Sequence, residues 1–117
     1  MAETAFAQPT VPEMLRLLRH AYTTLIAAHH PTMTDAQRLL TVADDLHWYA
    51  ERLGAARVAM PPKAQRWSFA ENLWHVTEQA MQESPITPAH SIIYFIDHGK
   101  EHVGQAAEIF ALFEYSS

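Results

Sequence analysis

Apolar residues recur every three or four positions in four segments of the chain, at about residues 11–29, 35–53, 69–83 and 88–114. This spacing is typical of amphipathic α-helices, and no segment shows the sustained alternation expected of a β-strand. The residues expected to face the core are Leu15, Leu18, Tyr22 and Leu25 in the first segment; Leu39, Val42, Leu46, Tyr49 and Leu53 in the second; Phe69, Leu73, Val76 and Ala80 in the third; and Ile92, Phe95, Ile96, Val103, Phe110 and Phe113 in the fourth. A chain of 117 residues suits one domain, so the pattern predicts an all-α four-helix bundle spanning residues 1–117.

Each segment begins with residues that favour a helix N-terminus. Three starts carry the capping-box pattern, in which a Ser or Thr and a Glu or Gln three residues later bond each other's backbone N–H groups. These pairs are Thr10 and Glu13, Thr34 and Gln37, and Ser68 and Glu71, while the fourth segment opens with Thr87 and Pro88. Gly54 is expected to end the second helix, and the stretch AARVAMPPKAQRW after it is the only long connection expected between helices.

Composition narrows the functional classes. The net charge is −5, and phosphate backbones are bound mainly through Lys and Arg, so we expect no nucleic-acid partner. The chain has no Cys, which excludes disulfides, zinc–thiolate sites and a thiol nucleophile made by this chain. Its start, MAETAFAQPT, lacks the basic and apolar regions of a signal peptide, and the apolar run IIYFI is too short to span a bilayer. We therefore expect no membrane association and a cytoplasmic location.

Histidine is the unusual feature of the composition, with eight residues against eight Lys plus Arg. His98 and His102 lie four residues apart in the fourth segment, and residues at this spacing project from one face of a helix, about 6 Å apart along its axis. Gln105 follows one turn later on the same face. Helical zinc sites use paired histidines at this spacing. The alternative is a pair of partly buried, hydrogen-bonded histidines without a metal.

A third ligand is expected from His75, because catalytic metal sites typically keep three protein ligands and one open position. His75 lies opposite the apolar face of the third segment, on a polar stripe that includes Glu71 and Glu78. If this stripe faces the polar stripe of the fourth segment, the two form one pocket; the alternative is that His75 belongs to a solvated face. The predicted metal ligands are His75, His98 and His102, and the residues predicted to orient them are Glu71, Glu78 and Gln105.

Two di-iron patterns fit less well. His47 and Glu51 in the second segment, together with the pair in the fourth, resemble part of the hemerythrin pattern, but no His or Asp follows position 102. Ferritin-type sites need Glu-x-x-His on two helices, and the interval from Glu71 to His75 is one residue too long. The remaining histidines are expected to be solvated: His20, His29, His30 and His90.

The fourth segment is apolar around much of its circumference, which predicts that a second chain covers part of it. One side carries Ile92, Ile96, Val103 and Phe110, and another carries Phe95, Ala106, Ile109 and Phe113. Gly99 and Gly104 interrupt the segment, and because Gly inside a helix costs roughly 1 kcal/mol relative to Ala, they suggest a close approach of another helix. We expect a homodimer whose interface involves this helix or its neighbours; the alternative is that both glycines serve packing within one bundle.

Two segments resemble a known superfamily. MPPKAQRWSFAENLWHV resembles the PP…W-S-x-x-E-x-x-x-H segment of the DinB/YfiT-like helical bundles, and DHGKEHVGQ resembles their closing H-x-x-x-H-x-x-Q helix. The resemblance covers residues 61–79 and 96–109; the chain is shorter than most members and places two helices before the first motif. It implies a four-helix bundle that binds a divalent metal through His75, His98 and His102 and often forms a dimer.

The spacing and the resemblance lead to one functional hypothesis. Three neutral imidazoles hold a divalent ion, Zn²⁺ or Ni²⁺, whose open position binds water or a low-molecular-weight thiol supplied as a cosubstrate. The protein would then be a metal-dependent, thiol-using transferase or hydrolase. The alternative is a non-enzymatic helical dimer, an interaction module in which the histidine site is structural or vestigial.

Overall fold

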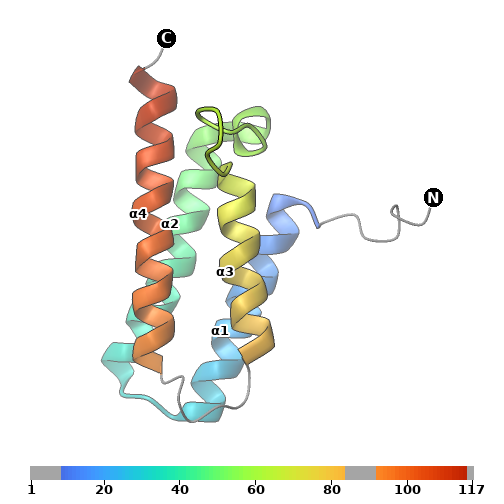
Figure 1. Ribbon diagram of the computed structural model, residues 1–117. Helices are drawn as coiled ribbons and strands as arrows, with labels where there is room; N and C mark the ends of the chain where they lie inside the picture. Colours follow the sequence, from blue (N-terminus) through green and yellow to red (C-terminus); the bar gives the residue numbers. More distant parts are fainter. Residues whose placement is uncertain (1–8, 84–91, 116–117) are drawn as a thin grey trace, which may run out of the picture.

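The computed structural model describes residues 9–83 and 92–115, which fold into helices packed as a bundle (Figure 1). The helices are α1 (Val11–His29), α2 (Met33–Val58), α3 (Phe69–Glu83) and α4 (Ile92–Tyr115). The predicted all-α four-helix bundle is confirmed. The expected start of the fourth helix at Thr87 and Pro88 lies outside the described residues.

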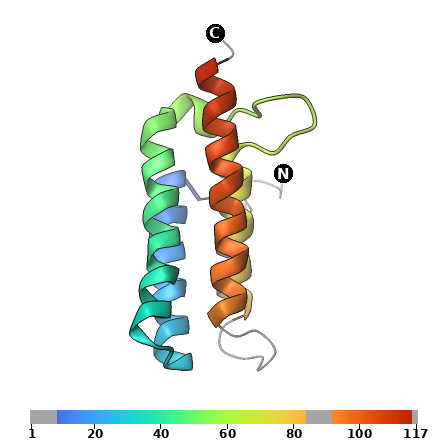
Figure 2. The same cartoon turned by 90° about the vertical axis from the view of Figure 1, so that its left-hand side faces the viewer.

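The order of the helices around the bundle differs from their order in the sequence. α2 packs mainly on α4 and α1 mainly on α3, whereas the pairs α2–α3 and α1–α4 touch least. The order around the bundle is therefore α1, α2, α4, α3, and the connection from α2 to α3 crosses a diagonal. In Figures 1 and 2 each helix runs opposite to the one before it, and this long connection lies near α4 at the end of the bundle where α3 begins.

Side-chain caps define where α1 and α3 begin, as predicted. Thr10 Oγ1 accepts the Glu13 N–H at 3.3 Å, and Glu13 Oε1 accepts the Thr10 N–H at 2.9 Å. The Ser68 and Glu71 pair makes the same two bonds, at 3.1 and 2.8 Å. Each pair satisfies backbone N–H groups that the first turn of a helix leaves without partners.

The predicted start of α2 at Thr34 is wrong by two residues. Thr32 is the N-cap, and its hydroxyl accepts the Asp35 N–H at 3.1 Å. This start puts the Asp35 carboxylate in the first turn, where the helix dipole favours negative charge. The predicted end at Gly54 also needs correction: Gly54 leaves helical geometry, with φ 85° and ψ 165°, but the helix resumes as far as Val58. Gly54 is therefore a kink, in a conformation that glycine adopts without a Cβ penalty.

One apolar face from each helix contributes to a shared core. Every predicted core position of α3 is buried, and among the predicted positions of α1 and α2 only Leu15 and Tyr49 are half-buried. Removal of apolar surface from water contributes about 25 cal/mol per Å², so these faces hold the helices together. The helical spacing therefore identified most core positions of α1, α2 and α3.

α4 buries part of its apolar surface in its own bundle. Ile92, Phe95, Ile96, Ala106 and Ile109 are buried among the other helices, whereas the predicted core residues Val103, Phe110 and Phe113 are half-buried. A continuous polar stripe faces solvent, formed by Asp97, Lys100, Glu101, Gly104, Gln105 and Glu108. No described helix is both long and apolar enough to cross a bilayer.

The two glycines of α4 have different surroundings. A Cβ on Gly99 would lie 2.7 Å from Val42 Cγ1 of α2 and 3.0 Å from the Tyr22 hydroxyl of α1. Gly99 therefore lets α4 pack closely against α2 and α1 of the same bundle, so this glycine serves packing within one bundle. A Cβ on Gly104 would have nothing within 4 Å, so packing among the described residues does not explain Gly104.

Alanine at these two glycines makes a matched pair of tests. Gly99→Ala adds a methyl group against β-branched Val42, and overpacking of this kind costs about 1–3 kcal/mol. Gly104→Ala adds the same methyl group to open space and should gain up to about 1 kcal/mol through helix propensity. Urea unfolding of both variants should show these opposite changes in the free energy of unfolding. Equal stability of the two variants would contradict the close contact at Gly99.

Candidate metal centre

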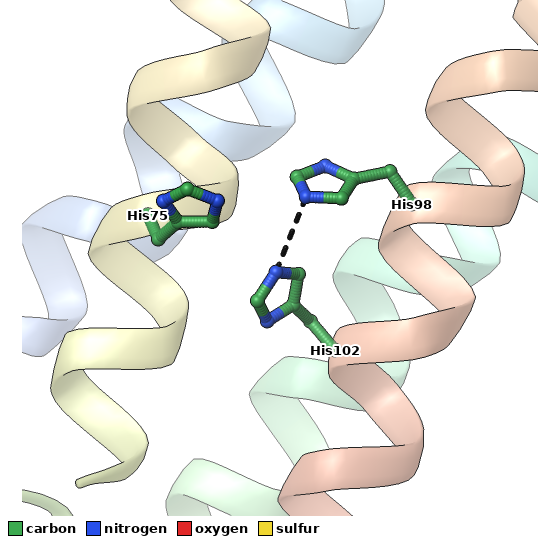
Figure 3. Close-up of side chains that lie close together, drawn as sticks. All are labelled: His75, His98 and His102. Atoms are coloured by element: carbon green, nitrogen blue, oxygen red, sulfur yellow. Dashed lines mark hydrogen bonds between the residues drawn. The ribbon is translucent and has the colours of Figure 1, made fainter. Parts of the chain in front are cut away.

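His75 of α3 and His98 and His102 of α4 point toward one another between the two helices (Figure 3). One ring nitrogen from each residue lies within 4.8 Å of the other two. His98 Nε2 and His102 Nε2 are 3.3 Å apart. Two nitrogens bound to a tetrahedral zinc ion at about 2.0–2.1 Å are separated by about 3.3 Å, so this pair already has the spacing of two metal ligands.

His102 is the buried member of the cluster, and Asn72 fixes its protonation. His102 Nδ1 lies 2.9 Å from Asn72 Oδ1, and both residues are 5% exposed. Asn72 Nδ2 donates to the Ser68 carbonyl, which leaves the Asn72 oxygen facing His102 as an acceptor. The His102 proton therefore sits on Nδ1, and the lone pair of Nε2 is directed toward His98. This is the tautomer that a metal bound at Nε2 requires.

His98 is positioned by its own helix and by α3. Its ring stacks on that of Tyr94 one turn earlier, with centroids 6.0 Å apart and an interplanar angle of 15°. Gln79 of α3 donates a hydrogen bond to the Tyr94 hydroxyl at 2.8 Å. Because His102 Nε2 carries no proton, His98 Nε2–H is the donor between the two rings. This bond matches the alternative of two hydrogen-bonded histidines, and a metal ion would take the place of its proton.

His75 is the third imidazole of the cluster, which a hydrogen-bonded pair of histidines without a metal would not need. Its ring centroid is 5.4 Å from that of His98 and 5.3 Å from that of His102. The indole of Trp67, in the connection before α3, packs edge-on against His75 at 5.4 Å. His75 is exposed, which matches the alternative that it belongs to a solvated face. Its ring nevertheless lies next to those of His98 and His102. The cluster therefore has one buried, one half-buried and one exposed imidazole.

The surroundings keep His98 and His102 neutral. Burial, and then the nearby His98 and His75, lower the pKa of His102 from 6.5 to about 4. A hydrogen bond with Gln105 acts in the opposite direction. Burial and His75 also lower the pKa of His98, against the Glu101 carboxylate. An imidazole must be neutral to bind a metal ion, so both shifts favour the metal-binding form at pH 7.

The histidines open into a cavity of about 440 Å³. A volume of this size is typical of small-molecule sites. Its wall comes from α3, α4 and the connection from α2 to α3. Besides the histidines, the lining residues are Gln65, Arg66, Trp67, Asn72, Glu101, Gln105, Glu108 and Ile109.

A tight turn brings the connection onto this cavity. The Arg66 N–H donates to the Lys63 carbonyl at 3.2 Å, and Gln65 has a φ of 64°. Positive φ at the third residue of a turn usually falls to Gly or Asn, so Gln65 holds a strained backbone conformation. Strain of this kind concentrates at functional sites. Arg66 also pairs with Glu108 of α4, Nη2 to Oε2 at 3.0 Å, which ties the turn to the helix.

The residues predicted to orient the ligands have different places. Glu71 Oε1 accepts the Ser68 N–H in the cap of α3, so the S-x-x-E part of the motif starts the helix. Gln105 lines the cavity, and its predicted role in orienting His102 stays a prediction. Glu78 is half-buried on α3, and its role stays a prediction.

Asn72 is the residue that sequence reasoning missed. It is the only Asn in the chain and lies one turn before His75 on the same helix. Asn competes with the helical backbone for hydrogen bonds and is disfavoured inside helices. An Asn at a core-facing helical position therefore needs a buried polar partner, and this was the available signal.

The other described histidines lie apart from this cluster. His47 Nε2 and Glu51 Oε2 lie 3.2 Å apart on the exposed face of α2, and neither residue belongs to the three-histidine group. His20 and His30 are exposed, as expected, whereas His29 is half-buried. His90 lies outside the described residues. The di-iron patterns therefore find no support in these positions.

The donor set fits a divalent ion, since three imidazoles converge and one is held in the required tautomer. Comparisons with protein families, with curated proteins and with solved structures found no match. The fold and the site define a four-helix bundle with a three-histidine cluster that could hold a metal ion.

Asn72→Ala tests the hydrogen bond behind His102 without removing a ligand. Loss of such a partner typically lowers metal affinity about 10–100-fold, so the Zn²⁺ affinity measured by competition titration should fall by that factor. Asn72→Asp keeps an acceptor of the same shape and should retain or raise the affinity. Unchanged Zn²⁺ affinity in Asn72→Ala would show that this bond does not position His102.

The metal-free protein should lose stability in acid through His102. Its pKa is about 4 in the folded state, below the ordinary value of 6.5, so the unfolded chain binds more protons between these two values. This contribution is complete above about pH 6.5 and falls by about 2–3 kcal/mol as the pH approaches 4.

Urea unfolding in the presence of a chelator, repeated between pH 7 and about pH 4, measures this loss. The His102→Gln variant lacks the titrating ring and should show a shallower decline. Parallel stability curves for the variant and the unaltered protein would rule out His102 as the source.

Proposed function

We propose that this protein binds a divalent metal ion, Zn²⁺ or Ni²⁺, through His75, His98 and His102. We further propose that it is a DinB-like, thiol-using transferase or hydrolase. The observation that carries the proposal is the convergence of three imidazoles from two helices, one of them fixed in the metal-binding tautomer by Asn72. The resemblance of the two sequence motifs supplies the reaction class.

A bound divalent ion lowers the pKa of the water or thiol in its open position, so that a nucleophile forms at neutral pH. The chain's own residues would hold the ion: the three histidines would supply three ligands, and a water or thiol would complete the site. The adjoining cavity of about 440 Å³ offers room for a small molecule. Because the chain has no Cys, the thiol comes from a cosubstrate, and thiols stay reduced in the cytoplasm, where we place the protein.

The ligand assignment predicts a sharp mutational pattern. His75→Ala, His98→Ala and His102→Ala each remove one of three ligands, so each should abolish tight metal binding. His20→Ala and His47→Ala change exposed histidines on other helices and should leave it unchanged. The metal content of protein purified without a histidine tag, measured by elemental mass spectrometry, distinguishes the two groups. Equal metal content in all of these variants would refute the assignment of His75, His98 and His102 as the metal ligands.

One surface favours the second candidate function, that of a helical dimer acting as an interaction module. Trp48 of α2 is 46% exposed and packs edge-on against Phe110 of α4 at 6.2 Å. Tyr49 lies 5.9 Å from Phe110, and the Arg52 guanidinium lies 4.3 Å above the Trp48 ring. Aromatic residues and Arg are enriched in protein interfaces. We propose that this α2–α4 face, formed by Trp48, Tyr49, Arg52 and Phe110, joins two copies of the chain, with or without catalysis.

Solution mass tests the dimer. Light scattering at micromolar concentration should give twice the chain mass of 13.3 kDa. Trp48→Asp places a charge in the α2–α4 face and should return the protein to a monomer, because a desolvated, unpaired charge is costly. Met33→Asp is the control, since Met33 is 78% exposed at the start of α2, and it should stay dimeric. A mass near 13.3 kDa for the unaltered protein would refute the dimer.

A further inference from the structure

We infer that Arg66 forms a carboxylate-binding subsite beside the three histidines, so that the cavity takes a thiol that also carries a carboxylate. The inference rests on the proposed metal-dependent, thiol-using function and gives that site a second point of recognition. Among the described residues that line the cavity, Arg66 is the only Lys or Arg. It is therefore the one permanently charged cation that the cavity offers to an anionic group.

Arg66 lines the same cavity as the three histidines. The strained turn at Gln65 leads directly into Arg66, and the next residue, Trp67, contacts the His75 ring at 5.4 Å. All three of these loop residues line the cavity that the histidines share. A small ligand held at the histidines therefore occupies a cavity that Arg66 also lines.

The present partner of Arg66 is a weak competitor for a ligand. The Arg66 and Glu108 side chains are 41% and 57% exposed, and their contact is 3.0 Å. Exposed ion pairs contribute little net stability, because water solvates both charges when they separate. A guanidinium can hold a free carboxylate through two parallel hydrogen bonds. Glu108 thus keeps Arg66 oriented toward α4 and can be displaced by the carboxylate of a ligand.

The charge around the cavity also favours an anionic ligand once the metal ion is bound. Neutral imidazoles do not compensate the charge of a divalent ion. Glu101 and Glu108 line the same cavity, but together they offset only part of the combined charge of the ion and Arg66. A ligand that brings both a thiolate and a carboxylate therefore meets a net positive site.

Two thiols that differ by a carboxylate test the subsite: N-acetylcysteine and N-acetylcysteamine. Their binding is measured on the Co²⁺-loaded protein, in which a cobalt–thiolate bond gives a charge-transfer absorption band. N-acetylcysteine should bind about tenfold more tightly, the size expected for a charge-assisted hydrogen bond. Arg66→Gln should abolish this difference, and Glu108→Gln, which removes the competing carboxylate, should enlarge it.

Arg19→Gln and Asp44→Asn are matched controls, because they break another exposed Arg–carboxylate pair, 2.6 Å long, between α1 and α2. Both should leave the binding of either thiol unchanged. If the Arg66–Glu108 pair only ties the turn to α4, Arg66→Gln and Glu108→Gln will shift binding in the same direction for both thiols. That result overturns the subsite.

The remaining outcomes separate the subsite from the metal site. Co²⁺ binding with equal affinity for the two thiols, or with no binding of either, overturns the subsite and leaves the metal ligands standing. Failure to bind Co²⁺ overturns the proposed metal site and the subsite with it. Opposite effects of Arg66→Gln and Glu108→Gln, confined to N-acetylcysteine, support the subsite.

Discussion

The hydrogen bond between Asn72 and His102 is the interaction on which the α3–α4 interface depends. A buried ring nitrogen left without a partner costs about 1–3 kcal/mol, so the Asn72 acceptor removes a substantial penalty for placing His102 between the helices. Asn72 is itself held by the Ser68 carbonyl, while the Ser68 side chain caps α3. One short segment therefore starts the helix, satisfies the buried imidazole and selects the nitrogen that a metal ion would meet.

The helices and the core could be predicted because their signals are local. Apolar spacing identified Leu18, Leu46 and Leu73 as core residues, and all three are inaccessible to solvent. The start of α2 was mispredicted because Thr34 and Gln37 have the capping-box spacing, whereas Thr32 caps the helix through its hydroxyl alone. The order of the helices around the bundle was also beyond the sequence pattern, since it depends on which apolar faces pair across long separations.

The site shows the same division. The four-residue interval placed His98 and His102 on one face, and the polar stripe singled out His75, but their meeting required α3 and α4 to be neighbours. Asn72 could not be assigned from its own surroundings, because its partner lies on another helix. Glu71 fitted both the capping box and the role of orienting a histidine ligand. Its carboxylate accepts the Ser68 N–H in the cap of α3, because Ser68 is only three residues away.

The diagonal connection between α2 and α3 also bears on the speed of folding. The most extensive contacts, α1 with α3 and α2 with α4, join helices that are separated by a whole helix in the sequence. Such pairings raise the contact order, because the chain loses loop-closure entropy before the burial of apolar surface compensates for it. A bundle whose neighbours follow one another along the chain folds with less of this delay. The pairs α1–α2 and α3–α4 are the local pairings, and the three histidines all lie in the second of them.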